Sequence, residues 1–516
     1  MKAAMLLCVL SSSLSACAEP LTVDEVLAKV REGTGRAHLP AAGVRMTGTT
    51  EFLGLPEDCT LTMTGSGSFI LEQSGKVPFT RAVGAKGPWM VDIGGEVRRL
   101  FLGDAEEARL LAAACTGCWM DSPACVPLDL SVDAAKGNEN RLHLAFTLRD
   151  GVTHGDISID THTWRPAEWT MQAGSRTEVL TFIGDLMVDG AWLPRQIVEV
   201  GQEGATSTYT FTAATPAPAF FRSPYEPASL TPRDITFDPA VPAALESRRA
   251  KTGHALVKVL VDGKLGWFIF DTGAGGTVID AAFADQVGLT PFGSVQAVGV
   301  GGAVTTTFVR PKAFTVGPAT QAEALLTRLD LSRIAKAMGE KIDGVVGYNI
   351  MHRTIARLST ADGSVSLHDP AKFDDHGIRW YPLIVYDRHA CLEASFEDHT
   401  GVFKLDTGAG TQPVSMHFPA VERFKLLEGR PLKDASAGGV GGNVKMKSGT
   451  LAWLEIGGRR EENVPATFAI EPKGLFANPF TLGNLSLKQV GPRDLVFDYA
   501  GGRIAFPDRA TAAPAK

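Results

Sequence analysis

The sequence contains no cluster of basic residues, and this absence argues against nucleic acid as a binding partner. Its 50 Lys and Arg residues and 57 Asp and Glu residues are spread along the chain and give a formal net charge of -7. Nucleic-acid binding depends on cationic side chains gathered on one surface. The sequence therefore predicts no nucleic acid among the partners of this protein.

Long hydrophobic runs are absent beyond the N-terminus. A membrane-spanning helix needs about 20 consecutive apolar residues, and no such run follows the first residues of the chain. Those first residues have the order of an export signal, because Lys2 precedes an apolar segment at 3–14 and small residues follow at 15–18. We therefore predict a signal peptide at 1–18 and an exported, soluble remainder.

Two cleavage sites fit this signal segment. The run 14–17 (Leu-Ser-Ala-Cys) resembles a bacterial lipobox, and cleavage there makes Cys17 a lipidated N-terminus anchored in the outer membrane. The run 16–18 (Ala-Cys-Ala) fits the small-residue rule for release before Glu19. Both alternatives place the protein in the cell envelope, either free in the periplasm or lipid-anchored.

Cysteine is scarce, and four of the seven cysteines fall in the predicted first domain, at Cys59, Cys115, Cys118 and Cys125. An oxidising compartment favours disulfides among these four, without fixing which residues pair. The spacing of Cys115 and Cys118 is also that of a redox or metal motif. No second motif of this kind and no histidine at ligand spacing accompanies it, so we predict no metal. We expect the isolated Cys391 to be a small buried hydrophobic residue.

Glycine is abundant, with 55 residues. Because helices tolerate glycine poorly, we expect many turns and a protein rich in β-structure. Residues 21–32 are an exception, a predicted helix in which Thr22 and Glu25 form a capping box. Residues 44–215 alternate between apolar and polar types, which is typical of antiparallel strands. The sequence therefore predicts an N-terminal antiparallel β domain at 19–214.

Short strings within residues 156–200 of this domain resemble periplasmic lipoprotein-carrier proteins, which are open β-barrels. The resemblance implies a concave apolar face for a lipid or a partner, and a β scaffold without a ligand is the alternative. Prolines then recur across 215–247. Because proline removes backbone donors and disfavours regular structure, we predict a linker there.

The second half of the chain contains an internal repeat. Three landmarks occur twice in the same order: Asp-Thr-Gly-Ala-Gly at 271–275 and 406–410, Gly-Val-Gly-Gly at 299–302 and 439–442, and a hydrophobic residue with Gly at 346–347 and 482–483. Their spacing is nearly equal in the two copies. The chain therefore carries two copies of one structural unit.

These landmarks resemble the aspartic peptidases, and in particular the retroviral-type (retropepsin-like) branch. In that family a D-T-G-A turn forms the active site, a Gly-rich hairpin forms a flap, and a hydrophobic-Gly motif supports the catalytic loop. The resemblance covers residues 251–507. It implies two acid-protease β-barrel lobes, at 248–372 and 373–508, that form a pepsin-like pseudo-dimer, and it leaves a disordered tail at 509–516. The predicted fold class is mainly β.

The resemblance also implies which residues form the site. Asp271 and Asp406 are the implied catalytic pair. Thr272, Gly273, Thr407 and Gly408 support the two catalytic loops, and Val346, Gly347, Leu482 and Gly483 form the two hydrophobic-Gly motifs. The candidate substrate-binding flap residues are Gly299, Gly301, Gly302, Gly439, Gly441 and Gly442.

The chemistry explains why two aspartates are needed. Two carboxylates a few ångström apart cannot both ionise cheaply, so they share one proton. The ionised member takes a proton from water, which attacks the scissile carbonyl, and the protonated member donates to the carbonyl oxygen. This reaction needs no metal, cofactor or covalent intermediate. The sequence therefore predicts an exported aspartic endopeptidase that acts on a protein or peptide substrate.

Three alternatives stay open at this point. The chain can be a peptide- or lipid-binding envelope protein that uses a peptidase fold without turnover. The lobes can pair between two chains, although the short segment at 370–388 favours pairing within one chain and hence a monomer. The first domain or the proline-rich linker can also act as an autoinhibitor that covers the site.

Overall fold

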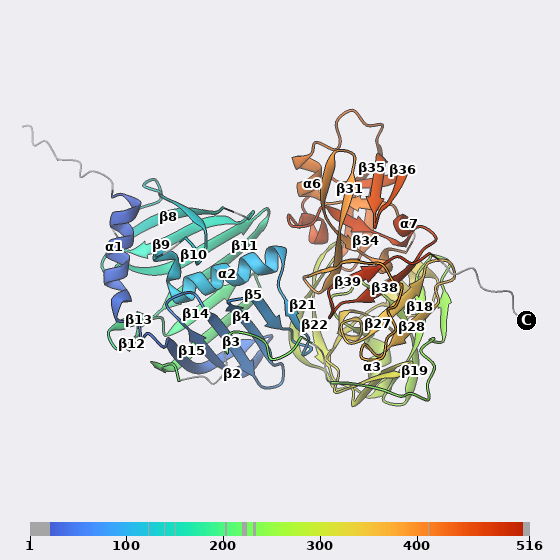
Figure 1. Ribbon diagram of the computed structural model, residues 1–516, viewed down its shortest axis with the longest axis horizontal. Helices are drawn as coiled ribbons and strands as arrows, with labels where there is room; N and C mark the ends of the chain where they lie inside the picture. Colours follow the sequence, from blue (N-terminus) through green and yellow to red (C-terminus); the bar gives the residue numbers. More distant parts are fainter. Residues whose placement is uncertain are drawn as a thin grey trace, which may run out of the picture.

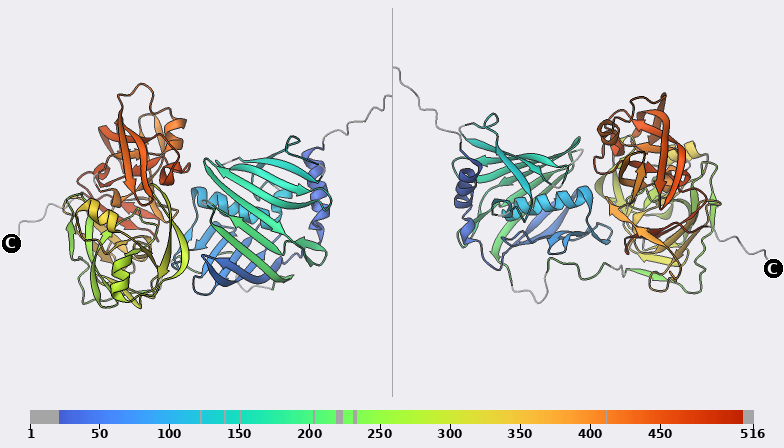
Figure 2. Two further views of the ribbon diagram at one scale, coloured as in Figure 1. Left: turned by 180° about the vertical axis from the view of Figure 1, so that it is seen from behind. Right: turned by 45° about the horizontal axis from the view of Figure 1, so that its top comes forward.

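The computed structural model describes residues 21–508 of the chain except 122, 139, 150, 202–203, 219–223, 231–233 and 411. The predicted signal peptide, with Cys17, and the predicted tail at 509–516 lie outside the described residues. The described chain is mainly β and forms two bodies side by side, an N-terminal β domain and a two-lobed unit (Figure 1, Figure 2). None of its helices is both long and apolar enough to cross a bilayer.

The N-terminal domain is built on one antiparallel sheet in the order β6-β5-β4-β3-β2-β1-β15-β14-β11-β10-β9-β8-β7. Its strands are β1 (Val44–Phe52), β2 (Leu55–Met63), β3 (Phe69–Ser74), β4 (Phe79–Gly84), β5 (Gly87–Val91), β6 (Val97–Arg99), β7 (Leu128–Val132), β8 (Arg141–Leu148), β9 (His154–Asp160), β10 (Arg165–Ala173), β11 (Arg176–Ile183), β14 (Gln196–Val200) and β15 (Thr206–Pro216). A separate small hairpin joins β12 (Leu186–Val188) to β13 (Ala191–Leu193).

Two helices pack on this sheet (Figure 1). The first, α1 (Val23–Gly33), begins with the predicted capping box: the Thr22 hydroxyl accepts from the Glu25 amide, and the Thr22 amide donates to the Glu25 carboxylate. The second, α2 (Leu102–Thr116), buries Leu110 and Leu111 in the core that it shares with the inward side chains of the sheet. The apolar side chains of the alternating strands therefore face a core that the helices close.

One disulfide joins Cys118, in the 3-10 turn η2 (Cys118–Met120), to Cys125. Cys59 and Cys115 are unpaired, so the two cysteines of the C-x-x-C motif are not bonded to each other. Cys391 is buried, as expected, and burial raises the pKa of its thiol to about 12. The disulfide closes a short loop after α2. It stabilises the fold because it restricts the conformations of the unfolded chain.

The first lobe contains a mixed sheet in which the linker takes part. Its strands are β16 (Ile235–Phe237), β17 (Ser247–Arg249), β18 (Ala255–Val261), β19 (Lys264–Phe270), β20 (Val278–Asp280), β21 (Phe292–Gly299), β22 (Gly302–Val309), β23 (Ala313–Val316), β24 (Ala319–Ala322), β25 (Leu326–Leu329) and β26 (Gly344–Val346). Its helices are α3 (Ala281–Val287), α4 (Ser332–Met338) and α5 (Tyr348–Met351). Although β16 lies in the proline-rich segment, it pairs with β24. That segment is therefore partly an edge strand of this lobe.

The second lobe repeats the same arrangement with its own strands. These are β30 (Ile384–Tyr386), β31 (His389–Phe396), β32 (His399–Leu405), β33 (Val414–Met416), β34 (Lys433–Gly439), β35 (Gly442–Ile456), β36 (Arg459–Ala469) and β37 (Gly483–Leu485). The helical segments are α6 (Phe418–Arg423), α7 (Leu487–Val490), η4 (Thr407–Ala409) and η5 (Gly474–Ala477). In both lobes a hairpin, β18–β19 or β31–β32, delivers an aspartate to the end of a buried strand.

A third sheet of the two-lobed unit joins the lobes, and Figure 1 draws its strands β38 and β39 between β31 and β19. It has the order β28-β27-β38-β39-β29, made of β28 (Val365–His368), β27 (Ile355–Ser359), β38 (Asp494–Asp498), β39 (Arg503–Ala505) and β29 (Trp380–Pro382). The central pair, β27 with β38, brings together strands from the first and the second copy of the repeat. Both lobes share one hydrophobic core. The pseudo-dimer is therefore assembled within this chain.

Candidate active site

Asp271 and Asp406 each follow the last residue of a buried strand. The Asp271 amide donates to the Val346 carbonyl at 3.0 Å, because β19 runs parallel to β26. The Asp406 amide donates to the Leu485 carbonyl at 2.8 Å, because β32 runs parallel to β37. The backbone of each aspartate is therefore fixed by the strand beside it.

Thr272 and Thr407 join the two turns that carry Asp271 and Asp406. The Thr407 hydroxyl accepts from the Thr272 amide at 3.0 Å and donates to the Phe270 carbonyl at 2.9 Å. The Thr272 hydroxyl accepts from the Thr407 amide at 3.1 Å and donates to the Leu405 carbonyl. Both threonines are 1% exposed. This reciprocal, buried set of bonds fixes the position of one lobe against the other.

The two carboxylates converge on the glycines of the turns. The Asp271 Oδ1 atom accepts from the Gly273 amide at 2.7 Å and from the Gly408 amide at 2.8 Å. A Cβ atom on Gly273 would lie 2.4 Å from Asp406 Oδ1 and 3.0 Å from Asp271 Oδ1. A Cβ atom on Gly408 would lie 2.2 Å from Asp271 Oδ2. Glycine is required at both positions because a side chain would occupy the space of the carboxylates.

The surroundings of the two aspartates differ. Burial raises the pKa of Asp406 to about 7, and the neighbouring Asp271 carboxylate adds to the shift. Burial also raises the pKa of Asp271, but the Gly273 and Gly408 amides oppose this because N–H donors stabilise the ionised carboxylate. These contacts favour the state in which the single proton of the pair lies on Asp406 and Asp271 is ionised.

Two polar side chains that sequence reasoning missed lie beside Asp406. Asn484 donates from Nδ2 to Asp406 Oδ2 at 3.4 Å, and its Oδ1 atom lies 3.1 Å from Nε2 of the buried His417. His254, from the first lobe, lies with Nε2 2.7 Å from the Gly408 carbonyl oxygen. Asn484 directly follows the predicted motif at Leu482 and Gly483, so the sequence could have indicated it as a site residue. His254 lies in none of the repeated motifs, so nothing in the sequence indicated its role.

The second hydrophobic-Gly motif does not take the place that the repeat predicts. Val346 accepts from Asp271, but its counterpart at Asp406 is Leu485, three residues after the predicted Leu482. In strand register Gly483 corresponds to Gly344, at the start of β26, rather than to Gly347. The predicted second motif at Leu482 and Gly483 is therefore wrong, because its place in the strand register is three residues too early. A Leu-Gly string is too common in sequences to determine strand register.

The predicted flap residues lie at the tips of two hairpins. Gly299 pairs with Gly302 between β21 and β22, and Gly439 pairs with Gly442 between β34 and β35. The tips touch: the Gly301 amide donates to the Val440 carbonyl at 2.8 Å. The predicted Gly301 and Gly441 approach the opposite tip so closely that a Cβ atom on either would lie within 2.5 Å of its backbone. The two hairpins therefore meet through their glycines.

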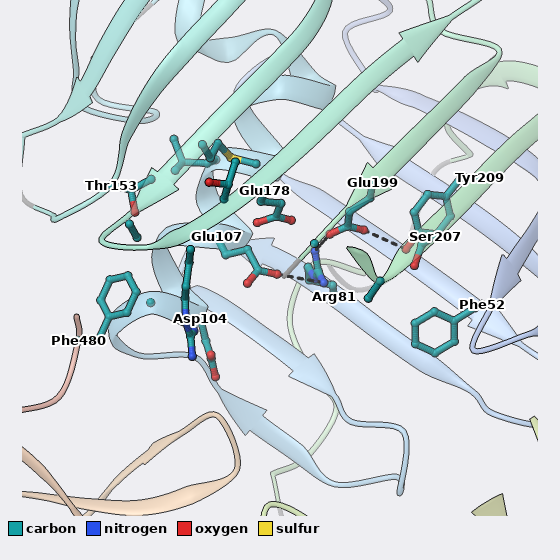
Figure 3. Close-up of a pocket in the computed structure, with 18 residues that line it drawn as sticks. Phe52, Arg81, Asp104, Glu107, Thr153, Glu178, Glu199, Ser207, Tyr209 and Phe480 are labelled. Carbon is teal, nitrogen blue, oxygen red and sulfur yellow. Dashed lines mark hydrogen bonds and ion pairs between the residues drawn. The ribbon is translucent and has the colours of Figure 1, made fainter. Parts of the chain in front are cut away.

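A cavity of about 290 Å³ lies elsewhere, between α2 and the sheet of the N-terminal domain (Figure 3). Figure 3 shows Arg81 between Glu107 and Glu199, with ion-pair distances of 3.2 Å and 2.9 Å. Glu107, Glu178 and Glu199 place carboxylate oxygens within 4.8 Å of one another, and burial beside the other two carboxylates raises the pKa of Glu178. This lining is charged, whereas the resemblance to lipoprotein carriers implies an apolar face.

Comparison with known proteins identifies an aspartyl protease-like region. A family model described as "Aspartyl protease" matches residues 257–350, which include Asp271, Val346 and Gly347 but not Asp406. No curated protein matches the chain.

Two solved structures are similar to part of the chain. One is a LolA superfamily protein from Nitrosomonas europaea, with 12% identity and a TM-score of 0.28 over 39% of this chain and 96% of that chain. The other is a DUF1329 family protein from Desulfovibrio piger, with 11% identity and a TM-score of 0.28 over 39% of this chain and 95% of that chain.

The raised pKa of Asp406 predicts how stability depends on pH. The pKa is about 7 in the folded protein and about 3.9 in an unfolded chain. As the pH rises from about 4 to 7, the unfolded state releases a proton that the folded state retains, so this group lowers stability. We expect the free energy of unfolding of Asp406→Asn at pH 7 to exceed that of the wild type by on the order of 4 kcal/mol, and the two values to agree near pH 4, as measured by urea denaturation.

The matched control is Asp434→Asn, which removes an exposed carboxylate that pairs with Lys447. This variant should show no gain in stability at pH 7. An Asp406→Asn variant that is no more stable than the wild type at pH 7 would contradict the raised pKa.

Proposed function

We propose that this protein is an aspartic endopeptidase in which Asp271 and Asp406 act as one proton-sharing pair. The observation that carries the proposal is the convergence of the two carboxylates at Gly273 and Gly408. The match of residues 257–350 to an aspartyl protease model supports the class of reaction. The substrate is a protein or peptide.

In the proposed mechanism the pair polarises one water molecule. The ionised Asp271 accepts a proton from the water as its oxygen attacks the scissile carbonyl carbon, and the protonated Asp406 donates its proton to the carbonyl oxygen. Collapse of the tetrahedral intermediate breaks the C–N bond, and a proton passes from the pair to the leaving amine. The Gly273 and Gly408 amides support this assignment because they stabilise the negative charge on Asp271.

We propose that the two hairpin tips bind the substrate as a pair of flaps. An extended peptide is recognised mainly through its backbone, and glycine-rich tips leave backbone N–H and C=O groups open to it. The bond from Gly301 to Val440 joins the tips, so a substrate enters after that bond opens. Pairing of β27 with β38 supports a fused tandem of retropepsin-like lobes that acts as a monomer.

Replacing either aspartate tests the mechanism. Asp271→Asn and Asp406→Asn should each lower kcat/KM for a peptide-library substrate by about 10³-fold or more, because neither variant can share a proton between two carboxyl groups. Pepstatin should inhibit the wild type. Asp129→Asn is the control, since its exposed side chain lies on β7 of the N-terminal domain, where it pairs with Arg149. Unchanged cleavage by Asp271→Asn would rule out the proposed pair.

The pH dependence of cleavage gives a second test. Activity requires one protonated and one ionised carboxyl group, so kcat/KM should follow a bell-shaped profile. Its alkaline limb should fall near pH 7, because the pair loses its proton as Asp406 ionises. Rates measured from pH 3 to 9 test this. A rate that continues to rise above pH 8 would contradict the assignment of the proton to Asp406.

We also propose that the protein is exported to the cell envelope and anchored there by a lipid on Cys17. The Cys118–Cys125 disulfide supports an oxidising compartment. In a bacterial host, the wild type should partition into the membrane fraction, and Cys17→Ala should move to the soluble fraction. Mass spectrometry of a soluble wild-type chain that begins at Glu19 would instead establish release by the alternative cleavage.

A further inference from the structure

The turn between β5 and β6 extends from the N-terminal domain to α5 of the first lobe. We infer that Glu96, in this turn, is a positioning residue for the catalytic turn of Asp271, so that the N-terminal domain completes the active site. This inference rests on the proposed peptidase function. It contrasts with an N-terminal domain that inhibits the enzyme by covering it.

Glu96 is buried where the two bodies meet. Its side chain is 1% exposed, and that of its partner Arg353 is 0% exposed. The Glu96 Oε1 atom accepts from Asn349 Nδ2 at 2.8 Å and from Arg353 Nη1. Arg353 also donates to the carbonyl oxygens of Asn349, at 2.9 Å, and of Gly94, at 2.7 Å. Glu96 thus holds two side chains of the first lobe from another domain.

Asn349 transmits this contact to the catalytic turn. Its Oδ1 atom accepts from the Thr277 amide at 2.6 Å, and the Thr277 hydroxyl accepts from the Gly347 amide at 3.3 Å. Gly347 follows Val346, whose carbonyl fixes the Asp271 backbone. Because Nδ2 of Asn349 donates to Glu96, its Oδ1 atom must face Thr277. Without Glu96 the amide can rotate, and the Thr277 N–H loses its acceptor.

Neighbouring contacts make the same connection. The Tyr348 amide donates to the Ala274 carbonyl at 3.0 Å, and the Tyr348 hydroxyl donates to Asp92, at the other end of the β5–β6 turn, at 3.2 Å. Arg98 holds Asp92 through a 2.8 Å ion pair. Both acidic residues of this turn therefore contact α5, which begins directly after the hydrophobic-Gly motif.

In the part of the chain that the structure describes, the equivalent contacts at the turn of Asp406 come from the second lobe itself. There the Ser486 hydroxyl donates to the Gln412 carbonyl at 2.6 Å, and Gln489 Nε2 donates to the same carbonyl at 3.4 Å. All three residues belong to the second lobe. Among the described contacts, the turn of Asp271 is therefore connected to the N-terminal domain through Asn349, whereas Gln412, after the turn of Asp406, is held by its own lobe.

Hydrogen exchange and kinetics of full-chain variants test the inference. We expect Glu96→Ala to raise amide exchange about tenfold in residues 272–280 and to leave residues 412–416 of the second lobe unchanged. We expect kcat to fall about 10- to 100-fold with KM changed less than about threefold, because the contact positions the reacting group and does not touch the substrate. Glu96→Gln should retain kcat within about threefold, since its amide oxygen still accepts from Asn349 and Arg353.

The control is Glu226→Ala, which removes a carboxylate that bonds Arg99 and the Lys86 amide within the N-terminal half. This variant should keep wild-type exchange at 272–280 and wild-type kcat. Where Glu96→Ala does not fold, Asn349→Ala carries the test, because it breaks the connection to Thr277 and leaves the Glu96–Arg353 pair in place.

Two results would overturn the inference: unchanged exchange at 272–280 in the folded Glu96→Ala variant, or a rise of the same size in Glu226→Ala. If the wild type cleaves no peptide, the proposed peptidase function fails. The exchange measurement does not depend on cleavage, so it still decides whether Glu96 positions the turn of Asp271.

Discussion

The placement of two carboxyl groups against each other in a buried site is the constraint on which the rest of the two-lobed unit depends. Ionised carboxylates lose hydration there and repel each other, which makes the arrangement costly. The threonine bonds between Thr272 and Thr407 hold the turns together despite this cost, and the Gly273 and Gly408 amides stabilise charge on Asp271. The shared sheet through β27 and β38 keeps the lobes in register.

The two copies of the repeat have diverged in what surrounds each aspartate. The strand parallel to β19 carries Val345, and the strand parallel to β32 carries Asn484 at the same position, where it connects the Asp406 carboxylate to His417. The Asp271 carboxylate accepts hydrogen bonds from the backbone amides of Gly273 and Gly408. These differences make the pair chemically unequal, and they give Asp406 the higher pKa.

Much of the two-lobed unit could be predicted because the repeat encodes local structure twice. The turns with glycine at Gly273 and Gly408, the hairpin tips and the capping box at Thr22 depend on residues close in sequence. The register of Leu482 could not be predicted, because strand pairing is decided by side chains far along the chain. The Cys118–Cys125 pairing and the entry of β16 into the first-lobe sheet were likewise decided by distant contacts.

The sequence by itself determined the β-rich class, the repeat and the two aspartates. Each of these features can be recognised from the types of residues within short stretches of the chain. Only the tertiary structure decided that Glu96 lies beside Arg353 and Asn349, that Asn484 bonds Asp406, and that a charged cavity forms around Arg81. The physical reason is that buried polar groups need partners, and those partners come from whichever segments the packing of distant strands brings together.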